Sequence, residues 1–244
     1  MMRHMSPRGR KLLAWSLWLA SLGCCAAGLM AALLWIRPLT LGLLARGAGT
    51  ALTFPLGYAT IGLVLTLRRP ANPIGWLYAA SGLLWSLTIP FEPWLDQLGR
   101  DHRPLALAAR LAVVAGEIIW APAIACGITL PLLLLPDGRL RSRRWRLVVA
   151  AGVAGTTMEV VGWVLSPDPL TQTLRPVAKP FALHGVAGTV ATTVSLVGWA
   201  VLFACIPAAA VCVVLRFRAS SGVERQQLRW VAAGAATATA ARPC

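Results

Sequence analysis

The feature that most limits what this chain can fold into is a series of apolar stretches long enough to cross a lipid bilayer. The first, at 12–35, runs for 24 residues without a charged side chain. A helix needs about 20 such residues to cross the hydrocarbon layer, where it must also satisfy its own backbone hydrogen bonds. The alternation of period two that marks strands of a membrane barrel is not evident, so the sequence predicts helices.

We expect an all-α fold: a polytopic transmembrane helical bundle with six spans. The predicted spans are 12–35, 48–67, 74–89, 111–135, 147–165 and 186–215. Prolines remove backbone hydrogen bonds, so Pro122 and Pro131 are expected to kink the fourth span and Pro207 the sixth. In the fifth span, Gly152, Gly155 and Gly162 would let that helix approach a neighbour closely.

The composition agrees with a membrane protein and excludes several other classes. Of the 244 residues, 57% are hydrophobic and 13% are charged, whereas soluble domains have roughly 45–50% and about 25%. This excludes a disordered tail, a collagen-like chain and an ordinary soluble enzyme. The net charge is +15, but the basic residues cluster between apolar runs and lack a folded platform beside them. We therefore expect no nucleic-acid partner.

The basic residues predict the orientation of the chain in the cell membrane. With six spans, one side carries 16 Lys and Arg residues in short loops and termini, and the other side carries seven. Because Lys and Arg accumulate in short cytoplasmic loops, we expect a multi-pass plasma-membrane protein with both termini in the cytoplasm. The densest run, Arg139 to Arg146, is expected to meet anionic lipid headgroups of the bilayer.

The chain therefore divides into four predicted parts. Residues 1–11 form a basic cytoplasmic N-terminus, 12–215 the six-helix transmembrane domain, 216–229 a cytoplasmic basic segment and 230–244 an incomplete seventh apolar segment. The first apolar run exceeds the roughly 7–15 residues of a cleaved signal, so we expect an uncleaved first helix. The last run is either a tail at the membrane interface or a helix cut short by truncation or a change of reading frame.

Two acidic residues, Glu117 and Glu159, lie inside predicted spans and form a candidate intramembrane polar site. An ionisable group within the hydrocarbon layer is costly and marks a functional hypothesis by default. Each lies six residues from the outer end of its helix, about 9 Å below that edge. Either each carboxyl is protonated, hydrogen-bonded to a neighbouring helix or reached by shallow water, or the two line a pocket that senses protons, a cation or a lipid headgroup.

Other chemistry is not indicated. The six cysteines form no C-x-x-C pair, and five lie in apolar runs, where thiols pack as small hydrophobes. The three histidines are dispersed, so we expect no metal. G-x-S-x-G, G-x-G-x-x-G and Walker motifs are absent from the sequence; we therefore expect no cofactor and assign no catalytic residue.

Three segments, each beside a predicted cytoplasmic edge, resemble one family when taken in order. They are Arg-Pro-Ala-Asn-Pro-Ile-Gly-Trp-Leu at 69–77, Leu-Pro-Asp-Gly-Arg-Leu-Arg-Ser-Arg-Arg-Trp-Arg at 135–146, and Arg-Phe-Arg at 216–218 followed by Gly-Val-Glu-Arg-Gln-Gln-Leu-Arg-Trp at 222–230. Together they look like the N-terminal membrane region of actinobacterial-type sensor histidine kinases. Leu135 and Arg141 depart mildly from the family pattern, which has Phe and Pro there.

The resemblance implies a membrane input module for a cytoplasmic kinase of a two-component system. The matched residues are Asn72, Pro73, Gly75, Trp76, Pro136, Asp137, Gly138, Arg139, Arg143, Arg144, Trp145, Glu224, Arg225, Gln226 and Gln227. Family kinases act in pairs, which implies a homodimer. The phospho-accepting histidine region and the ATP lid are not in this sequence, so we expect a sensor module orphaned from its catalytic half and not an enzyme.

Two other functions stay open at this point. One is a small transporter or channel subunit whose path is lined by Glu117 and Glu159. The other is a non-catalytic membrane protein that associates with a partner through its helices.

Overall fold

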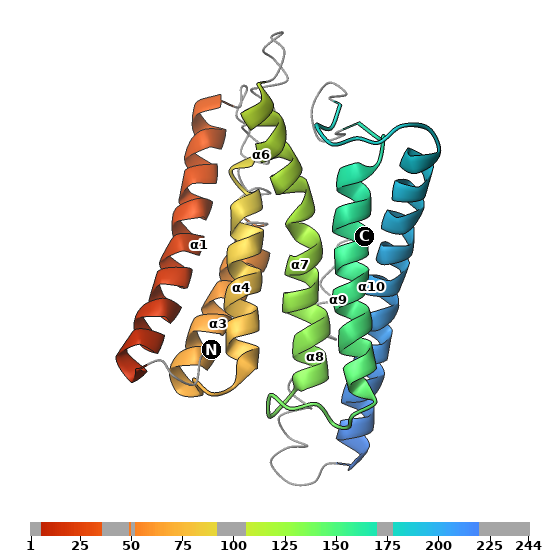
Figure 1. The fold of residues 1–244 in the computed structure, drawn as a ribbon. Coiled ribbons are helices and arrows are strands. Elements are labelled where there is room, and N and C mark those ends of the chain that lie inside the picture. The colour runs from red at the N-terminus through yellow and green to blue at the C-terminus, as the bar shows by residue number, and fades with distance from the viewer. Residues whose placement is uncertain (1–5, 36–48, 50–51, 92–105, 170–177, 220–244) are drawn as a thin grey trace, which may run out of the picture.

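A computed structural model describes residues 6–35, 49, 52–91, 106–169 and 178–219. Every regular element in these residues is helical, which confirms the all-α prediction (Figure 1). The elements, in chain order, are α1 (Pro7–Trp35), η2 (Leu52–Leu56), α3 (Gly57–Arg68), α4 (Pro73–Thr88), α6 (Leu107–Ile118), α7 (Trp120–Ile124), η3 (Ala125–Thr129), α8 (Leu130–Leu134), α9 (Trp145–Leu165) and α10 (Gly185–Ala219).

Four helical stretches are long and apolar enough to cross a membrane. They are Pro7–Leu34, Leu107–Leu134, Trp145–Leu165 and Gly185–Arg218, and they coincide with the first, fourth, fifth and sixth predicted spans. The length and apolar composition of these four helices indicate a membrane protein. The second and third predicted spans are not established as crossings, because α3 has 12 residues and α4 has 16. At 1.5 Å per residue, α4 covers only about 24 Å.

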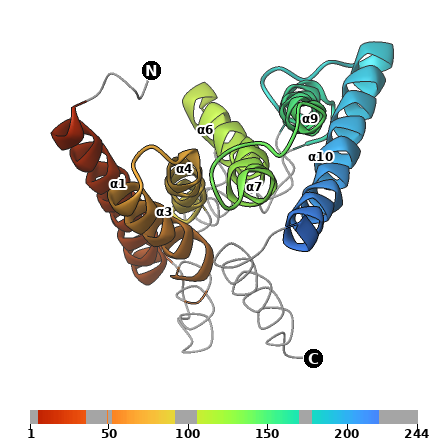
Figure 2. The same cartoon turned by 90° about the horizontal axis from the view of Figure 1, so that it is seen from below.

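The helices α3 and α4 form a tight antiparallel pair beside α1 (Figure 2). Glycines bring the two backbones together: a Cβ on Gly62 would lie 2.3 Å from the nitrogen of Ala79, and one on Gly82 would lie 2.4 Å from the nitrogen of Ala59. Pro73 at the start of α4 presets the helical φ angle and needs no hydrogen-bond partner. The turn between the two helices is therefore short and fixed.

The fourth predicted span is divided into several helical segments. The α-helical path of α6 and α7 passes into the π-helical η3 before α8. Pro122 lies in α7 and Pro131 in α8, and each removes a backbone donor from the helix. The expected disturbance at these prolines agrees with this division, whereas α10 continues as one α-helix through Pro207.

The most extensive helix–helix contact joins α9 to α10, and small residues let the two backbones approach closely. A Cβ on Gly162 would lie 2.4 Å from the nitrogen of Ser195, and one on Gly155 would lie 3.0 Å from the carbonyl oxygen of Gly198. The predicted close approach of the fifth span is confirmed at these two glycines, and its partner is α10. Gly198 contributes the matching gap on the α10 side.

The molecule is apolar on its outer faces and partly polar within. Large apolar side chains of α1 and α10 are exposed, including Leu19, Leu196 and Phe203, while Ser21 and Ser81 are fully buried. This distribution suits a lipid surround, in which apolar surface needs no burial and small polar residues join helices. It supports the membrane assignment independently of helix length.

Candidate functional site

The three family-like segments converge at one end of the bundle, to the extent that the structure describes them. This end, the lower one in Figure 1, holds the α3–α4 turn, the turn after α8 and the last turn of α10. We call it the motif end, and define it by residues 68–76, 135–146 and 216–218. Glu224, Arg225, Gln226 and Gln227 lie outside the described residues.

Asn72 joins the first segment to the second. Its side-chain Oδ1 accepts a hydrogen bond from the N–H of Ile74 at 3.0 Å, which caps the first turn of α4. Its Nδ2 donates to the carbonyl oxygen of Pro136 at 3.4 Å. Gly138, with φ of 74°, fits against Asn72, since a Cβ there would lie 2.5 Å from Oδ1. One side chain therefore caps a helix and holds a distant turn.

Arg216 joins the third segment to the second. This residue lies in the last turn of α10, is only 9% exposed, and donates from its guanidinium to three carbonyl oxygens of the turn. Nη1 donates to Leu135, and Nη2 donates to Leu133 at 3.2 Å and to Arg139. Because carbonyls near a helix end lack helical partners, the guanidinium satisfies groups that would otherwise be exposed or orphaned.

The other family-like residues lie around the hydrogen bonds of Asn72 and Arg216. Trp76 is buried and donates from Nε1 to the carbonyl of Pro70 at 3.2 Å. Gly75 lies against Thr66 of α3, and Trp145 packs beside the core formed by Leu133, Ala209 and Cys212. The remaining matched residues with described side chains, Asp137, Arg139, Arg143 and Arg144, are exposed. Among them only the backbone of Arg139 contacts Arg216.

The opposite end of the bundle holds the predicted acidic pair and an unpredicted lysine. Glu117 lies on α6, and Glu159 lies on α9 with 1% of its surface exposed. Lys179, in the segment before α10, is 3% exposed, and its Nζ donates to the carbonyl of Trp163 at 2.6 Å and to the hydroxyl of Ser166 at 2.7 Å. The same nitrogen lies 3.7 Å from the centroid of the Trp163 ring.

Electrostatics connect this lysine with the acidic residues. Burial lowers the pKa of Lys179, and the negative charges of Asp168, Glu117 and Glu159 oppose that change. The carboxylates of two helices thus act on one buried ammonium. In the described residues, no group of three or more His, Cys, Asp or Glu side chains is arranged to hold a metal ion.

Sequence reasoning missed both buried cations as site residues. Arg216 was part of a matched segment, and its place in the last turn of an apolar helix was the available signal. Lys179 gave no such signal, because its partners are far away in the sequence and a loop lysine ordinarily faces water. Comparison with known proteins finds no family model, no curated relative and no solved structure that matches the chain.

Proposed function

We propose that the chain is the membrane input module of a two-component sensor, of the kind that controls a cytoplasmic histidine kinase. The observation that carries the proposal is the junction at the motif end. Asn72 and Arg216 both bind the end of α8 and the turn after it, through the carbonyls of Pro136 and of Leu133, Leu135 and Arg139. The three segments were grouped only because each resembles the same family, and in the structure hydrogen bonds connect them.

The junction suits a module that passes a signal along α10. A rotation or tilt of α10 would move Arg216 and with it the turn that Asn72 fastens to α4. Signal transmission needs an element with two states that a stimulus biases, and a helix end held by a few hydrogen bonds can supply one. In the proposed module, the α3–α4 pair completes six crossings, both termini face the cytoplasm and the exposed arginines of the motif end meet anionic headgroups.

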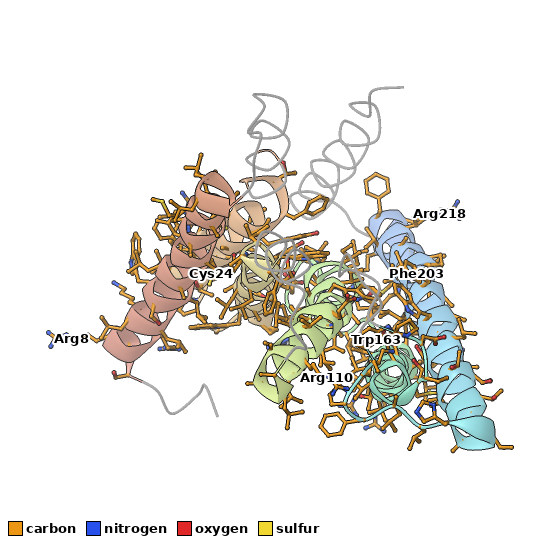
Figure 3. All side chains as sticks on the ribbon, turned by 90° about the horizontal axis from the view of Figure 1, so that it is seen from above. Arg8, Cys24, Arg110, Trp163, Phe203 and Arg218 are labelled. Carbon is orange, nitrogen blue, oxygen red and sulfur yellow. The ribbon has the colours of Figure 1, made fainter. Side chains whose placement is uncertain are left out.

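A chimeric kinase tests the proposal. Residues 1–218 are joined at Arg-Phe-Arg to the remainder of a histidine kinase of the resembled family, reconstituted in liposomes and assayed for autophosphorylation. Arg216→Ala should change the rate several-fold. Arg218→Ala is the matched control, because Arg218 lies in the same helical turn but is exposed and extends from the bundle (Figure 3).

Equal rates for the original chimera and both variants would contradict the proposal. If Arg216→Ala does not assemble, Asn72→Asp makes the same test, because it keeps an acceptor for the helix cap and removes the donor to Pro136. A homodimer is expected for the chimera, because such kinases act in pairs.

A transporter or channel subunit is the second candidate, favoured by one observation. Glu159 is buried within the bundle, and Glu117 and Glu159 both act on the charge of Lys179. In liposomes, a transporter should show proton or solute flux that Glu117→Gln or Glu159→Gln abolishes. Such flux in the unaltered protein would replace the sensor proposal.

A further inference from the structure

The segment 178–184 is fastened to two helices at the end of the bundle opposite the motif end. Arg110 of α6 donates from Nε at 3.1 Å and from Nη2 at 2.6 Å to the carbonyl of Ala178. Lys179 binds α9 through Trp163 and Ser166. Figure 3 shows Arg110 and Trp163 on neighbouring helices at this end. We call this segment the strap, because it joins α6 to α9.

Apolar packing is a minor part of what holds the strap. Its two largest apolar side chains, Phe181 and Leu183, are 53% and 40% exposed. The backbone of Leu183 does make one contact, a hydrogen bond from its N–H to the carbonyl of Leu165 at 2.9 Å. The buried side chain of the strap is instead its ammonium-bearing residue, Lys179. Polar contacts therefore decide where the strap lies.

A buried ammonium is costly unless it is paired and hydrogen-bonded. Lys179 has three N–H donors, and two of them reach Trp163 and Ser166 on α9. The face of the Trp163 ring adds a cation–π contact. These contacts are all made by one nitrogen to the last turn of α9 and the residue after it, so loss of the amine would remove them together.

Acidic residues of more than one element favour the charged form of this ammonium. Asp168, which follows α9, Glu117 of α6 and Glu159 of α9 all favour its charged form. These three carboxylates belong to the same end of the bundle as Arg110, the cation that binds the strap next to Lys179. The strap therefore brings the positive charge of Lys179 to an end of the bundle that carries three acidic residues.

We propose that the ammonium group of Lys179 latches the strap to the end of α9 beside the bond of Arg110 to α6, and that the carboxylates of Glu117 and Glu159 favour the charged form of this latch. Trp163 and Ser166 thus form a binding site for a primary ammonium group, and Lys179 of the same chain occupies it. Removing the amine opens the strap, and neutralising the carboxylates weakens the latch. This inference concerns the end opposite the motif end and does not depend on the proposed role in kinase control.

Hydrogen exchange of the strap amides tests the latch in lipid nanodiscs. The N–H of Leu183 should be protected in the unaltered protein, because it is bonded to Leu165. Lys179→Ala should lower that protection by about tenfold or more, since local opening exposes the amide. The double variant Glu117→Gln/Glu159→Gln should lower it in the same direction. Lys11→Ala is the matched control, because Lys11 is the one other lysine in the chain and is exposed.

Chemical rescue separates charge from packing. n-Propylammonium replaces the atoms that Lys179→Ala removes, and 1-propanol has a similar size without the charge. The amine should restore protection of the Leu183 amide, and the alcohol should not. Unchanged protection in both Lys179→Ala and the double glutamine variant would overturn the proposal, as would rescue by the amine no greater than by the alcohol. If Lys179→Ala does not fold, Lys179→Met, which keeps the length of the side chain, is measured for loss of protection instead.

Discussion

The two ends of the bundle are each fastened by a buried cation, but the cations differ in kind. At the motif end, the guanidinium of Arg216 donates to carbonyl oxygens of one turn. At the strap end, the ammonium of Lys179 donates to one carbonyl and one hydroxyl and lies over an indole ring. Three carboxylates act on it as well.

This difference teaches at which end the fastening charge can change. A guanidinium stays charged and offers five donors in a fixed planar arrangement, so its bonds to several carbonyls do not depend on a change of protonation. An ammonium is a compact charge that responds to burial and to neighbouring carboxylates. We infer that the charge that fastens the motif end is constant, whereas the charge that fastens the strap end responds to its surroundings.

The largest expected effect comes from breaking the motif end. Arg216→Ala should lower the free energy of unfolding by about 2–4 kcal/mol, because it leaves buried carbonyls of the turn without a charged donor. Thermal unfolding in detergent measures it, followed with a thiol-reactive dye in a background that keeps only Cys212, which is fully buried beside this end. Arg218→Ala should stay within about 0.5 kcal/mol, and equal losses would remove the distinction between these arginines.

A substitution midway between the ends should have the next largest effect. A Cβ on Gly198 would lie 2.3 Å from the nitrogen of Glu159 and 2.6 Å from the carbonyl oxygen of Gly155. Gly198→Ala should therefore separate α9 from α10 and cost about 1–3 kcal/mol. Gly23→Ala in α1 is the control, since nothing lies within 4 Å of its added Cβ, and it should not destabilise the protein. Unfolding in the same detergent compares the two.

Asn72 should show a smaller effect that can be divided into two parts. Asn72→Ala removes the cap of α4 and the bond to Pro136, and should cost about 1 kcal/mol. Asn72→Asp keeps an acceptor for Ile74 and loses only the donor to Pro136. Its thermal unfolding should therefore fall between those of the original protein and Asn72→Ala. An aspartate variant as unstable as the alanine variant would contradict this division.

At the strap end, the expected effect is a change in the pKa of Lys179 and not a large loss of stability. Because burial lowers the pKa of Lys179, its ammonium should lose its proton below the ordinary lysine value of about 10.4. Glu117→Gln/Glu159→Gln should lower that pKa further, since carboxylates favour the charged form. Nuclear magnetic resonance of ¹⁵N-lysine in nanodiscs reads it directly, and Lys179→Met assigns the signal. A pKa that rises in the double variant would be the contrary result.

The all-α fold and several helix limits could be predicted, because a helix that crosses a membrane appears in the sequence as one continuous apolar stretch. The predicted span 147–165 is close to α9, and 74–89 is close to α4. Four of the six predicted spans qualify as membrane-crossing helices. The other two, 48–67 and 74–89, are not established as crossings, because apolar character fixes the solvent of a segment and leaves its helical length open. Pro122 and Pro131 indicated disturbance, but they do not encode the π-helical η3.

The site was predictable only in part, since its contacts join residues far apart in the sequence. Glu117 and Glu159 stood out because acids are costly in apolar helices. Lys179 did not, since nothing local shows that a loop ammonium returns to Trp163 and Ser166. Asn72 and Pro136 belonged to matched segments, but the bond between them arises from packing alone.

The most direct test of the central claim, that the family-like segments form one hydrogen-bonded unit, is a double-mutant cycle between Asn72 and Arg216. Unfolding free energies are measured for Asn72→Asp, Arg216→Ala and the double variant in the same detergent. Because the two side chains bind adjacent carbonyls of one turn, at Pro136 and Leu135, we predict a coupling energy of about 0.5 kcal/mol or more. Additive losses would contradict the account.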